Sequence, residues 1–402
     1  MQLQSLSLTN YKQFKALELK CARRLNVLVG VNGAGKSSVL EAISLFLSWY
    51  VARLRAASLS ATGKPLQLAS IRHKSVSAKI EGVCHFYNPQ ADVAWKIART
   101  KNAVMKAEQS SFEQLNNFLK SFKLTGQLSK ENAGDIVYEA VPTLVYYATN
   151  RSVLDIPLKI RTHHLFSQLE SYDASLEGRA DFRSFFEWFR AREDIENERF
   201  RDGNATEDLQ LCMVKKAMSA FLPGFTHWRI HRQPLRMEVL TPGSQMPVSV
   251  NELSDGEKCL LAMVGDLARR LSMANPNSKD SLLGSGIVLI DEVELHLHPQ
   301  WQKDILPRLL STFPNLQFFI STHSPLVLSQ LNSALYCEAE KRKAGAPESE
   351  VVARETAVFT LRNGQLESLL DPETGLIATS EMDEVAISID QAFDELLEKN
   401  EQ

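Results

Sequence analysis

Residues 30–37 constrain this chain more than any other stretch. They read Gly-Val-Asn-Gly-Ala-Gly-Lys-Ser and fit the phosphate-binding loop pattern G-x-x-x-x-G-K-[ST]. An apolar run over 25–29 precedes the loop and a helical pattern over 38–54 follows it, which is the strand, loop and helix context that the motif requires. Glycines let backbone N–H groups turn towards a phosphate chain, and a helix N-terminus adds the positive end of its dipole. We therefore expect a nucleotide site; the alternative is a glycine-rich turn before a buried helix.

The loop also predicts which residues contact the nucleotide. The Lys36 side chain should reach the β- and γ-phosphates of ATP, and the Ser37 hydroxyl should hold Mg²⁺. The residues expected to bind the nucleotide here are Asn32, Gly33, Gly35, Lys36, Ser37 and Ser38.

Composition narrows the class of protein. A chain of 402 residues is longer than one average domain, which suggests two lobes or one domain with an insertion. The formal net charge of -3 argues against a strongly basic nucleic-acid binder, although a local basic patch is compatible with it. The five cysteines are scattered and contain no C-x-x-C pair, so we expect reduced thiols in a cytoplasmic protein. We expect no signal peptide and no membrane-spanning segment.

A second anion site is predicted over two hundred residues later. Residues 251–258 read Asn-Glu-Leu-Ser-Asp-Gly-Glu-Lys and precede a predicted helix over 259–271. Ser254 and Gly256 would then lie at a helix N-terminus, where backbone N–H groups bind anions.

Two carboxylates follow a buried strand. Residues 287–290 are apolar and lead into Asp291 and Glu292. Asp291 is expected to hold Mg²⁺, and Glu292 to orient and deprotonate an attacking water. The next predicted strand, 316–320, ends near His323, which could contact the γ-phosphate. His296 and His298 alternate in a way that could suggest a metal, but no third ligand has metal spacing, so we interpret them as loop residues beside the site.

Two further sites in the chain could contact the nucleotide, and each also has a purely structural interpretation. Strands are predicted over 2–8 and 16–19, with Lys12 in the turn between them. Lys12 could lie over the nucleotide or be a solvated turn lysine. A buried strand over 143–148 ends in a polar triplet, so Asn150 or Arg151 either faces the nucleotide or belongs to a strand-ending turn.

The middle of the chain has a different pattern. Helices are expected over 165–171, 181–199 and 209–221, and a strand over 228–239. The second helix carries an aromatic stripe, interpreted as a core face, with a partner-binding face as the alternative. The strand carries a basic cluster that could contact a nucleic-acid backbone or be a solvated face. This cluster consists of Arg229, His231, Arg232 and Arg236.

The C-terminal region carries weaker signals. Residues 338–350 are expected to form a surface loop, and 358–370 a hairpin around Asn363-Gly364. Residues 379–402 form an acidic, helix-prone tail that could dock onto the body or onto a partner.

The order of these motifs resembles that of an ABC-type ATPase head of the SMC, RecF and OLD group. Transporter domains of that superfamily typically carry Leu-Ser-Gly-Gly-Gln, whereas residues 253–257 here read Leu-Ser-Asp-Gly-Glu. The resemblance implies an α/β P-loop NTPase fold with a mixed sheet, flanking antiparallel strands and a helical insertion. It also implies a head-to-head homodimer in which Ser254 and Gly256 of one copy complete the ATP site of the other. SMC heads carry long coiled-coil arms, but residues 152–245 here show no sustained heptads, so no long coiled coil is expected.

The predicted organisation has four parts. They are an N-terminal ATPase lobe (1–151), a mainly helical insertion (152–245), a C-terminal ATPase lobe (246–337) and an extension with the acidic tail (338–402).

Several details resemble the compact AAA_21-like bacterial ATPases, which include the PtuA subunit of Septu anti-phage systems and ATPases of some retrons. These details are the segments 10–14, 147–151, 186–190, 193–198 and 294–299. The resemblance implies a separate HNH-type nuclease partner, and in retrons a reverse transcriptase with its nucleic acid. No H-N-H pattern or TOPRIM-like acidic cluster is evident, so nuclease activity is not expected in this chain.

Three hypotheses follow. In the first, the chain is an ATPase that regulates a partner nuclease in bacterial anti-phage defence. In the second, it is a RecF- or SMC-like ATPase that binds DNA directly in repair or chromosome maintenance. In the third, it is a scaffold that binds ATP but barely hydrolyses it.

Overall fold

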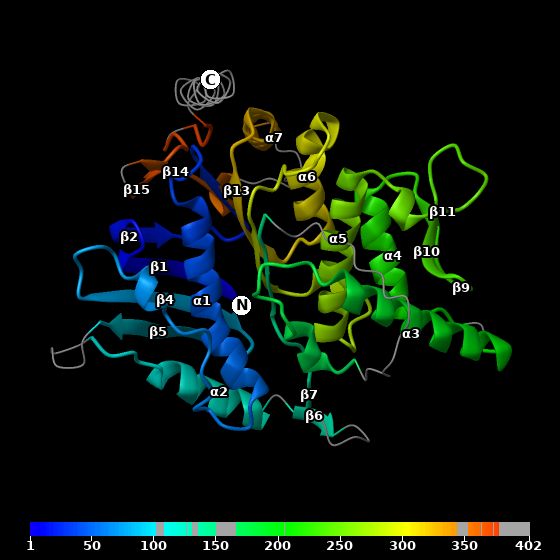
Figure 1. Ribbon diagram of the computed structural model, residues 1–402, viewed down its shortest axis with the longest axis horizontal. Helices are drawn as coiled ribbons and strands as arrows, with labels where there is room; N and C mark the ends of the chain where they lie inside the picture. Colours follow the sequence, from blue (N-terminus) through cyan, green and yellow to red (C-terminus); the bar gives the residue numbers. More distant parts are fainter. Residues whose placement is uncertain are drawn as a thin grey trace, which may run out of the picture.

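A six-stranded mixed sheet lies at the centre of the computed structural model, which describes residues 1–101, 108–125, 127–130, 136–149, 166–204, 206–343, 353–362, 364–372 and 374–377 (Figure 1). The strand order is β15-β14-β3-β13-β12-β8. All neighbours are parallel except β15, which pairs antiparallel with β14. The strands are β3 (Leu25–Val29), β8 (Thr143–Tyr147), β12 (Gly286–Ile290), β13 (Leu316–Thr322), β14 (Thr356–Arg362) and β15 (Gln365–Ser368).

The central strands are buried on both faces. Val27 and Val29 of β3 and Ile290 of β12 belong to one hydrophobic cluster, whereas Leu28 and Leu289 belong to a second cluster on the other face. This alternation follows from the pleat, which points successive side chains to opposite faces. It also explains why these strands read as continuous apolar runs in the sequence.

An antiparallel sheet covers one face, as predicted from the N-terminal strands. Its order is β2-β1-β4-β5, and Figure 1 shows it beside α1. The Trp95 ring of β5 stacks on the Phe46 ring of α1, with centroids 4.0 Å apart. The elements of this layer are β1 (Gln2–Tyr11), β2 (Phe14–Lys20), β4 (Ser77–Tyr87), β5 (Gln90–Thr100), α1 (Lys36–Arg55) and α2 (Glu113–Thr125).

Helices cover the other face. They are α3 (Phe182–Arg201), α4 (Leu209–Phe221), α5 (Asp255–Ala274), α6 (Pro299–Thr312) and α7 (Pro325–Lys343). The aromatic stripe of α3 is a core face, as interpreted from the sequence, because its rings are buried in the first cluster. Phe185 packs over Gly265 of α5, where an added Cβ would lie 2.9 Å from the ring.

Three details of the sequence prediction were wrong. In the described residues 166–172, the first predicted helix is replaced by the short 3-10 helix η2 (Gln168–Tyr172), which is followed at once by further turns. The segment 228–239 is a hairpin of β9 (Thr226–Arg232) and β10 (Leu235–Leu240), because Pro234 has no N–H for a continuous ladder. The loop expected from residue 338 is helical up to Lys343, since Glu, Ala, Lys and Arg are good helix formers.

Short elements complete the fold. They are β6 (Gln127–Lys130), β7 (Ile136–Tyr138), β11 (Val248–Ser249), η1 (Leu68–Ser70), η3 (Val250–Glu252), η4 (Ser281–Leu283) and η5 (Ala353–Glu355). Among the described residues, no helix is both long and apolar enough to cross a membrane. The hairpin predicted over 358–370 is confirmed by β14 and β15, whereas the acidic tail lies outside the described residues.

The architecture confirms the predicted fold class, an α/β mixed sheet flanked by antiparallel strands and helices. The longest helices in the described part of the chain, α1, α3 and α5, have 20 residues each, which fits the expectation of no long coiled coil. The four-part division at residues 151, 245 and 337 stays a prediction. Helices α3 and α4 share one hydrophobic cluster with α5 to α7, so the predicted insertion packs into the same core as the C-terminal lobe.

Candidate functional site

Three neighbouring parallel strands bring the predicted motifs to one edge of the sheet. In the strand register Val29 of β3 lies beside Thr322 of β13, and Ile320 of β13 lies beside Ile290 of β12. The chain therefore leaves β3 into the glycine loop, β13 into His323, and β12 into the two carboxylates, all at the same carboxyl edge. This is the edge at which open α/β sheets bind ligands. Helices α1 and α7 begin there (Figure 1).

The glycine loop packs against the turn between β1 and β2 on one side, and its other side is open. Gly35 caps α1 with a left-handed φ of 109°, and an added Cβ would lie 1.9 Å from Gln13 Nε2 and 2.7 Å from Phe14 Cζ. The turn between β1 and β2 thus packs directly on the loop. Gly33 has nothing within 4 Å of an added Cβ, and Asn32 and Ser37 are exposed. The free side of the loop can receive a phosphate chain.

Lys36 is buried inside the loop, with 5% of its surface exposed. Its Nζ donates to the carbonyl oxygens of Gly30 at 2.5 Å and Val31 at 3.1 Å. Burial lowers the pKa of Lys36, while the carboxylates of Glu292, Asp291 and Glu294 oppose that shift. The ammonium therefore lies in the field of all three carboxylates.

Hydrogen bonds to both neighbouring strands hold the carboxylate turn. The Asp291 N–H donates to the Tyr147 carbonyl of β8 at 2.8 Å. On the other side, the Ser321 hydroxyl donates to the Asp291 carboxylate and accepts the N–H of Glu292 at 2.8 Å. Asp291 is buried, whereas Glu292 is half-buried and has a left-handed φ of 47°. Sequence reasoning missed Ser321, whose only signal is its position two residues before His323.

His323 is anchored by a buried carboxylate that the sequence reasoning did not single out. The backbone N–H of His323 donates to Glu294 Oε1 at 2.7 Å. The ring Nδ1 lies 3.1 Å from the same oxygen, out of line for a hydrogen bond, and the two form an ion pair only when the ring is protonated. The His323 side chain is 38% exposed, so the ring is accessible at the sheet edge.

Ser254 and Gly256 lie at the start of α5, as predicted. Ser254 is the exposed N-cap and forms a capping box with Glu257, whose carboxylate accepts the Ser254 N–H at 2.7 Å. Gly256 is buried against the loop that follows Glu292, because an added Cβ would lie 2.7 Å from the His296 carbonyl oxygen. The two serine-glycine positions therefore differ: Ser254 faces solvent, and Gly256 packs on the carboxylate-bearing loop of its own chain.

The remaining predicted positions are less central. Lys12 pairs with Glu41 of α1, and Asn150 lies outside the described residues. Ser38 is half-buried in the first turn of α1. His298 caps α6 by accepting the N–H of Gln300, and His296 is exposed, which agrees with their interpretation as loop residues.

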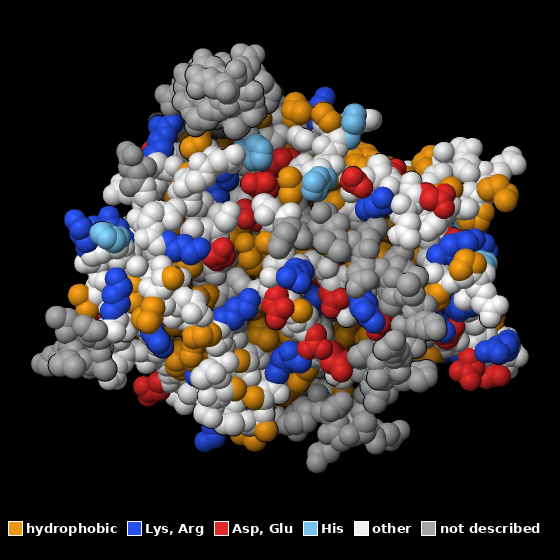
Figure 2. All heavy atoms as spheres, viewed as in Figure 1, with side chains coloured by type: hydrophobic (Ala, Val, Ile, Leu, Met, Phe, Trp, Pro, Cys, Tyr) orange, Lys and Arg blue, Asp and Glu red, His pale blue; other side chains and the backbone are white. Residues whose placement is uncertain are grey.

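The basic cluster of the β9–β10 hairpin is largely paired with acidic side chains. Arg229 and Arg236 both bind Glu238, at 2.8 and 2.7 Å. Arg232 binds Glu193 at 2.7 Å and also Asp194. Figure 2 shows acidic and basic side chains interspersed over this face of the molecule. This pairing favours the solvated-face interpretation over a nucleic-acid surface.

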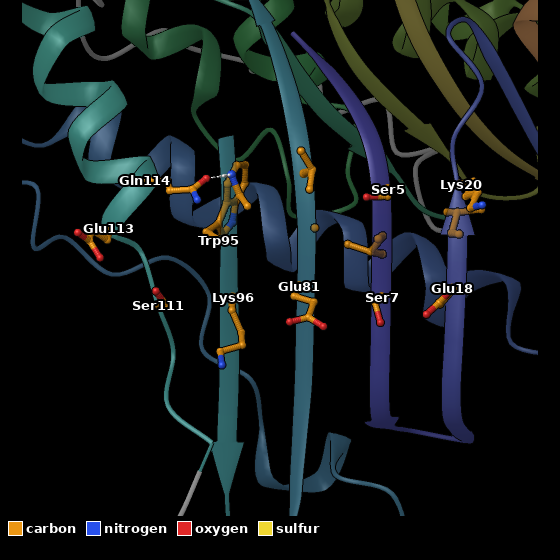
Figure 3. Close-up of a pocket in the computed structure, with 15 residues that line it drawn as sticks. Ser5, Ser7, Glu18, Lys20, Glu81, Trp95, Lys96, Ser111, Glu113 and Gln114 are labelled. Atoms are coloured by element: carbon orange, nitrogen blue, oxygen red, sulfur yellow. Dashed lines mark hydrogen bonds between the residues drawn. The ribbon is translucent and has the colours of Figure 1, made fainter. Parts of the chain in front are cut away.

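A hollow of about 600 Å³ lies on the outer face of the antiparallel sheet (Figure 3). Four of its lining residues are neighbours across adjacent strands and include both acidic and basic side chains. They are Glu18, Ser7, Glu81 and Lys96. Of the predicted nucleotide-binding residues that the structure describes, none lines it. We therefore place the candidate nucleotide site at the sheet edge and not in this hollow.

The chain is similar in sequence to known proteins, and its family follows from the match of its residues to one family model. Residues 2–344 match the RecF/RecN/SMC N-terminal domain. The chain is 30% identical over 394 residues to the Retron Ec83 probable ATPase of Escherichia coli, with 83% of this chain and 70% of that protein covered. It is 36% identical over 135 residues to the Septu protein PtuA of Bacillus mycoides (strain KBAB4), with 33% of this chain and 18% of that protein covered. The solved SMC head domain from Thermotoga maritima aligns with a TM-score of 0.44 at 17% identity, over 92% of this chain and 98% of that one.

Proposed function

Because the chain belongs to the RecF/RecN/SMC N-terminal domain family, we propose that it binds and hydrolyses ATP at an interface between two copies and regulates a partner nuclease in bacterial anti-phage defence. The observation that carries the ATPase proposal is the convergence of the glycine loop, the Asp291–Glu292 pair and His323 at one edge of three adjacent strands. The defence proposal is supported by the similarity to a retron ATPase and to a Septu protein.

The residues at this edge fit Mg²⁺ with a triphosphate. The loop offers an open face and the exposed residue Ser37, and the charges of Glu292, Asp291 and Glu294 act on the Lys36 ammonium. The described residues contain no group of three His, Cys, Asp or Glu side chains that could hold a metal by themselves. Mg²⁺ typically binds through one or two protein ligands together with substrate phosphates, so Ser37 and Asp291 suffice as its protein ligands. When bound, Mg²⁺ would neutralise negative charge on the phosphates.

Each side chain has a distinct role in the proposed hydrolysis. Lys36 would exchange its loop carbonyl partners for the phosphates, where its charge and the loop N–H groups stabilise the transition state. Glu292 would orient and deprotonate the attacking water. His323, held by Glu294, would contact the γ-phosphate from the neighbouring strand.

The second copy would supply Ser254. This side chain is exposed at the N-terminus of a 20-residue helix, where it can meet the anion bound by another chain. Gly256 is buried against its own chain, so we propose that it supports the segment in which Ser254 makes the contact between copies.

Purified protein tests the ATPase proposal. Wild type should hydrolyse ATP in Mg²⁺, Lys36→Ala should abolish hydrolysis, and Glu292→Gln should bind ATP and accumulate as a dimer on size-exclusion chromatography. Hydrolysis by Glu292→Gln at the wild-type rate would show that the general-base assignment is wrong. ATP binding with negligible turnover by the wild-type chain would favour a scaffold instead.

A mixing experiment tests whether the site is shared. Lys36→Ala and Ser254→Arg should each be inactive, yet their mixture should recover part of the activity because a mixed dimer contains one intact site. Ser278→Arg, just beyond the far end of α5, is the matched control and should stay active. No recovery on mixing would contradict a contribution from the second copy.

The partner is tested separately. A gene for an HNH-type nuclease should lie beside the gene for this chain, and in a retron a reverse transcriptase gene should lie there too. The nuclease, and in a retron the reverse transcriptase with its nucleic acid, should copurify with this chain from the cytoplasmic fraction. Salt-dependent binding of the isolated protein to DNA would favour the RecF-like alternative instead.

A further inference from the structure

Ser321 lies on β13, between the phosphate-loop strand and the carboxylate strand, and is fully buried. Its backbone is in register with Leu28 of β3, two residues before the glycine loop. Its side chain binds the carboxylate of Asp291 and the N–H of Glu292. Its carbonyl accepts the N–H of Val293 at 3.1 Å. One residue of β13 therefore holds three successive residues of the carboxylate turn.

The chemistry of a hydroxyl makes these contacts interdependent. A serine hydroxyl has one proton to donate and lone pairs to accept. The proton goes to the Asp291 carboxylate, so a lone pair receives the Glu292 N–H at 2.8 Å. Glu292 has a φ of 47°, a region that non-glycine residues adopt only when their surroundings hold them there. One side chain thus contacts both the carboxylate of Asp291 and the backbone of Glu292.

We propose that Ser321 is a positioning residue for ATP hydrolysis, which fixes the carboxylate of Asp291 and the backbone of Glu292 in their working orientations. This role rests on the proposed function, since it acts through the residues assigned there to Mg²⁺ and to the attacking water. Ser321 itself has no assigned contact with the nucleotide.

Steady-state kinetics of Ser321→Ala should separate orientation from binding. We expect kcat to fall about 10- to 100-fold and the Mg²⁺ concentration for half-maximal rate to rise, the range typical of removing a residue that orients a metal ligand. The KM for ATP should change little, because the glycine loop and Lys36 are untouched. Ser321→Thr keeps the hydroxyl and should restore most of kcat. If the alanine variant fails to fold, Ser321→Cys, a weak donor of similar size, replaces it.

The matched control is Ser44→Ala. Ser44 is also a buried serine, and its hydroxyl, on α1, donates to the Leu176 carbonyl at 2.9 Å. It should lower the unfolding temperature to a similar degree while keeping the wild-type kcat and Mg²⁺ dependence. An equal loss of kcat in both serine variants would overturn the proposal, since the effect would then be general destabilisation.

A double variant gives a second readout. If Ser321 acts through Glu292, adding Ser321→Ala to the Glu292→Gln variant should lower its residual single-turnover rate only slightly. The same substitution in the wild type should lower the rate far more. Wild-type hydrolysis with an unaffected Ser321→Ala overturns the positioning role and leaves the proposed function standing. Equal losses in both backgrounds overturn the action of Ser321 through Glu292. Absence of hydrolysis by the wild-type chain overturns the proposed function as well.

Discussion

Asp266→Asn should be among the most destabilising conservative substitutions in this chain. Asp266 is fully buried on α5 and accepts three hydrogen bonds. They come from Tyr147 Oη of β8 at 2.9 Å, Arg269 Nη2 at 2.7 Å and Arg270 Nε at 2.8 Å. Arg269 and Arg270 are themselves 3% and 0% exposed, so neither can turn to water when the carboxylate is lost.

The magnitude follows from this geometry. Removing one partner of a buried ion pair costs about 3–5 kcal/mol, because the other charge is left buried without compensation. Two arginines lose their counter-charge here, although the oxygen of the introduced amide could still accept the tyrosine hydrogen bond, so we expect a cost of about 3 kcal/mol or more. The matched control is Asp194→Asn, which removes the 52% exposed partner of Arg232 and should cost about 0–1 kcal/mol.

The contribution of Asp266 to the free energy of unfolding should fall at low pH. Burial would raise the pKa of Asp266, but Arg270 and Arg269 beside it hold that pKa below its ordinary value. A depressed folded-state pKa contributes stability above the unfolded value, about 3.9 for aspartate, and loses it as the pH falls through the folded value. The stability gap between wild type and Asp266→Asn should therefore be constant from about pH 5 to 8 and shrink below about pH 4.

Urea unfolding followed by circular dichroism measures this gap. Asp266→Asn should shift the unfolding midpoint much further than Asp194→Asn does. Equal shifts in the two variants would refute the reasoning, because the buried carboxylate would then contribute no more than an exposed one.

Three further outcomes are expected. Tyr147→Phe removes one hydrogen bond to a charged carboxylate and should cost about 1.5–3 kcal/mol of unfolding free energy in the same urea assay, and a cost near zero would contradict this. Gly35→Ala should abolish binding of a fluorescent ATP analogue, since its Cβ would lie 2.7 Å from Cζ of the buried Phe14 ring at a φ of 109°, whereas Gly203→Ala, also at a left-handed φ but in open space, should still bind. Gly256→Ala should lower kcat by displacing the loop after Glu292, and an unchanged kcat would show that the contact with that loop does not matter for hydrolysis.

The residues that sequence analysis could predict are those carried by motif spacing. The phosphate loop, Asp291, Glu292 and His323 each follow a short apolar run, and parallel strands bring such ends to one edge. The continuous apolar runs of β3, β12 and β13 likewise predict strands that are buried on both faces of the sheet.

The residues that sequence analysis missed act through contacts distant in the chain. Ser321 and Glu294 have no local signature, because their roles depend on how β13 meets the carboxylate turn, across separations of 30 and 29 residues in sequence. Gln13 was passed over in favour of its neighbour Lys12, although Gln13 is the side chain that contacts Gly35. The pairing of Arg232 with Glu193 has no local signature either, because Glu193 lies 39 residues earlier, on α3.

The double burial of the central sheet limits how the protein can move. Successive residues of β3 and β12 anchor two different hydrophobic clusters, so bending these strands would disturb packing on both faces at once. A hinge inside the sheet is therefore unfavourable, and the loop, the carboxylates and His323 should travel as one rigid body. In the proposed pair of copies, opening and closing during an ATP cycle would then occur at the boundary between them, as a change in their distance or rotation rather than in the shape of either copy.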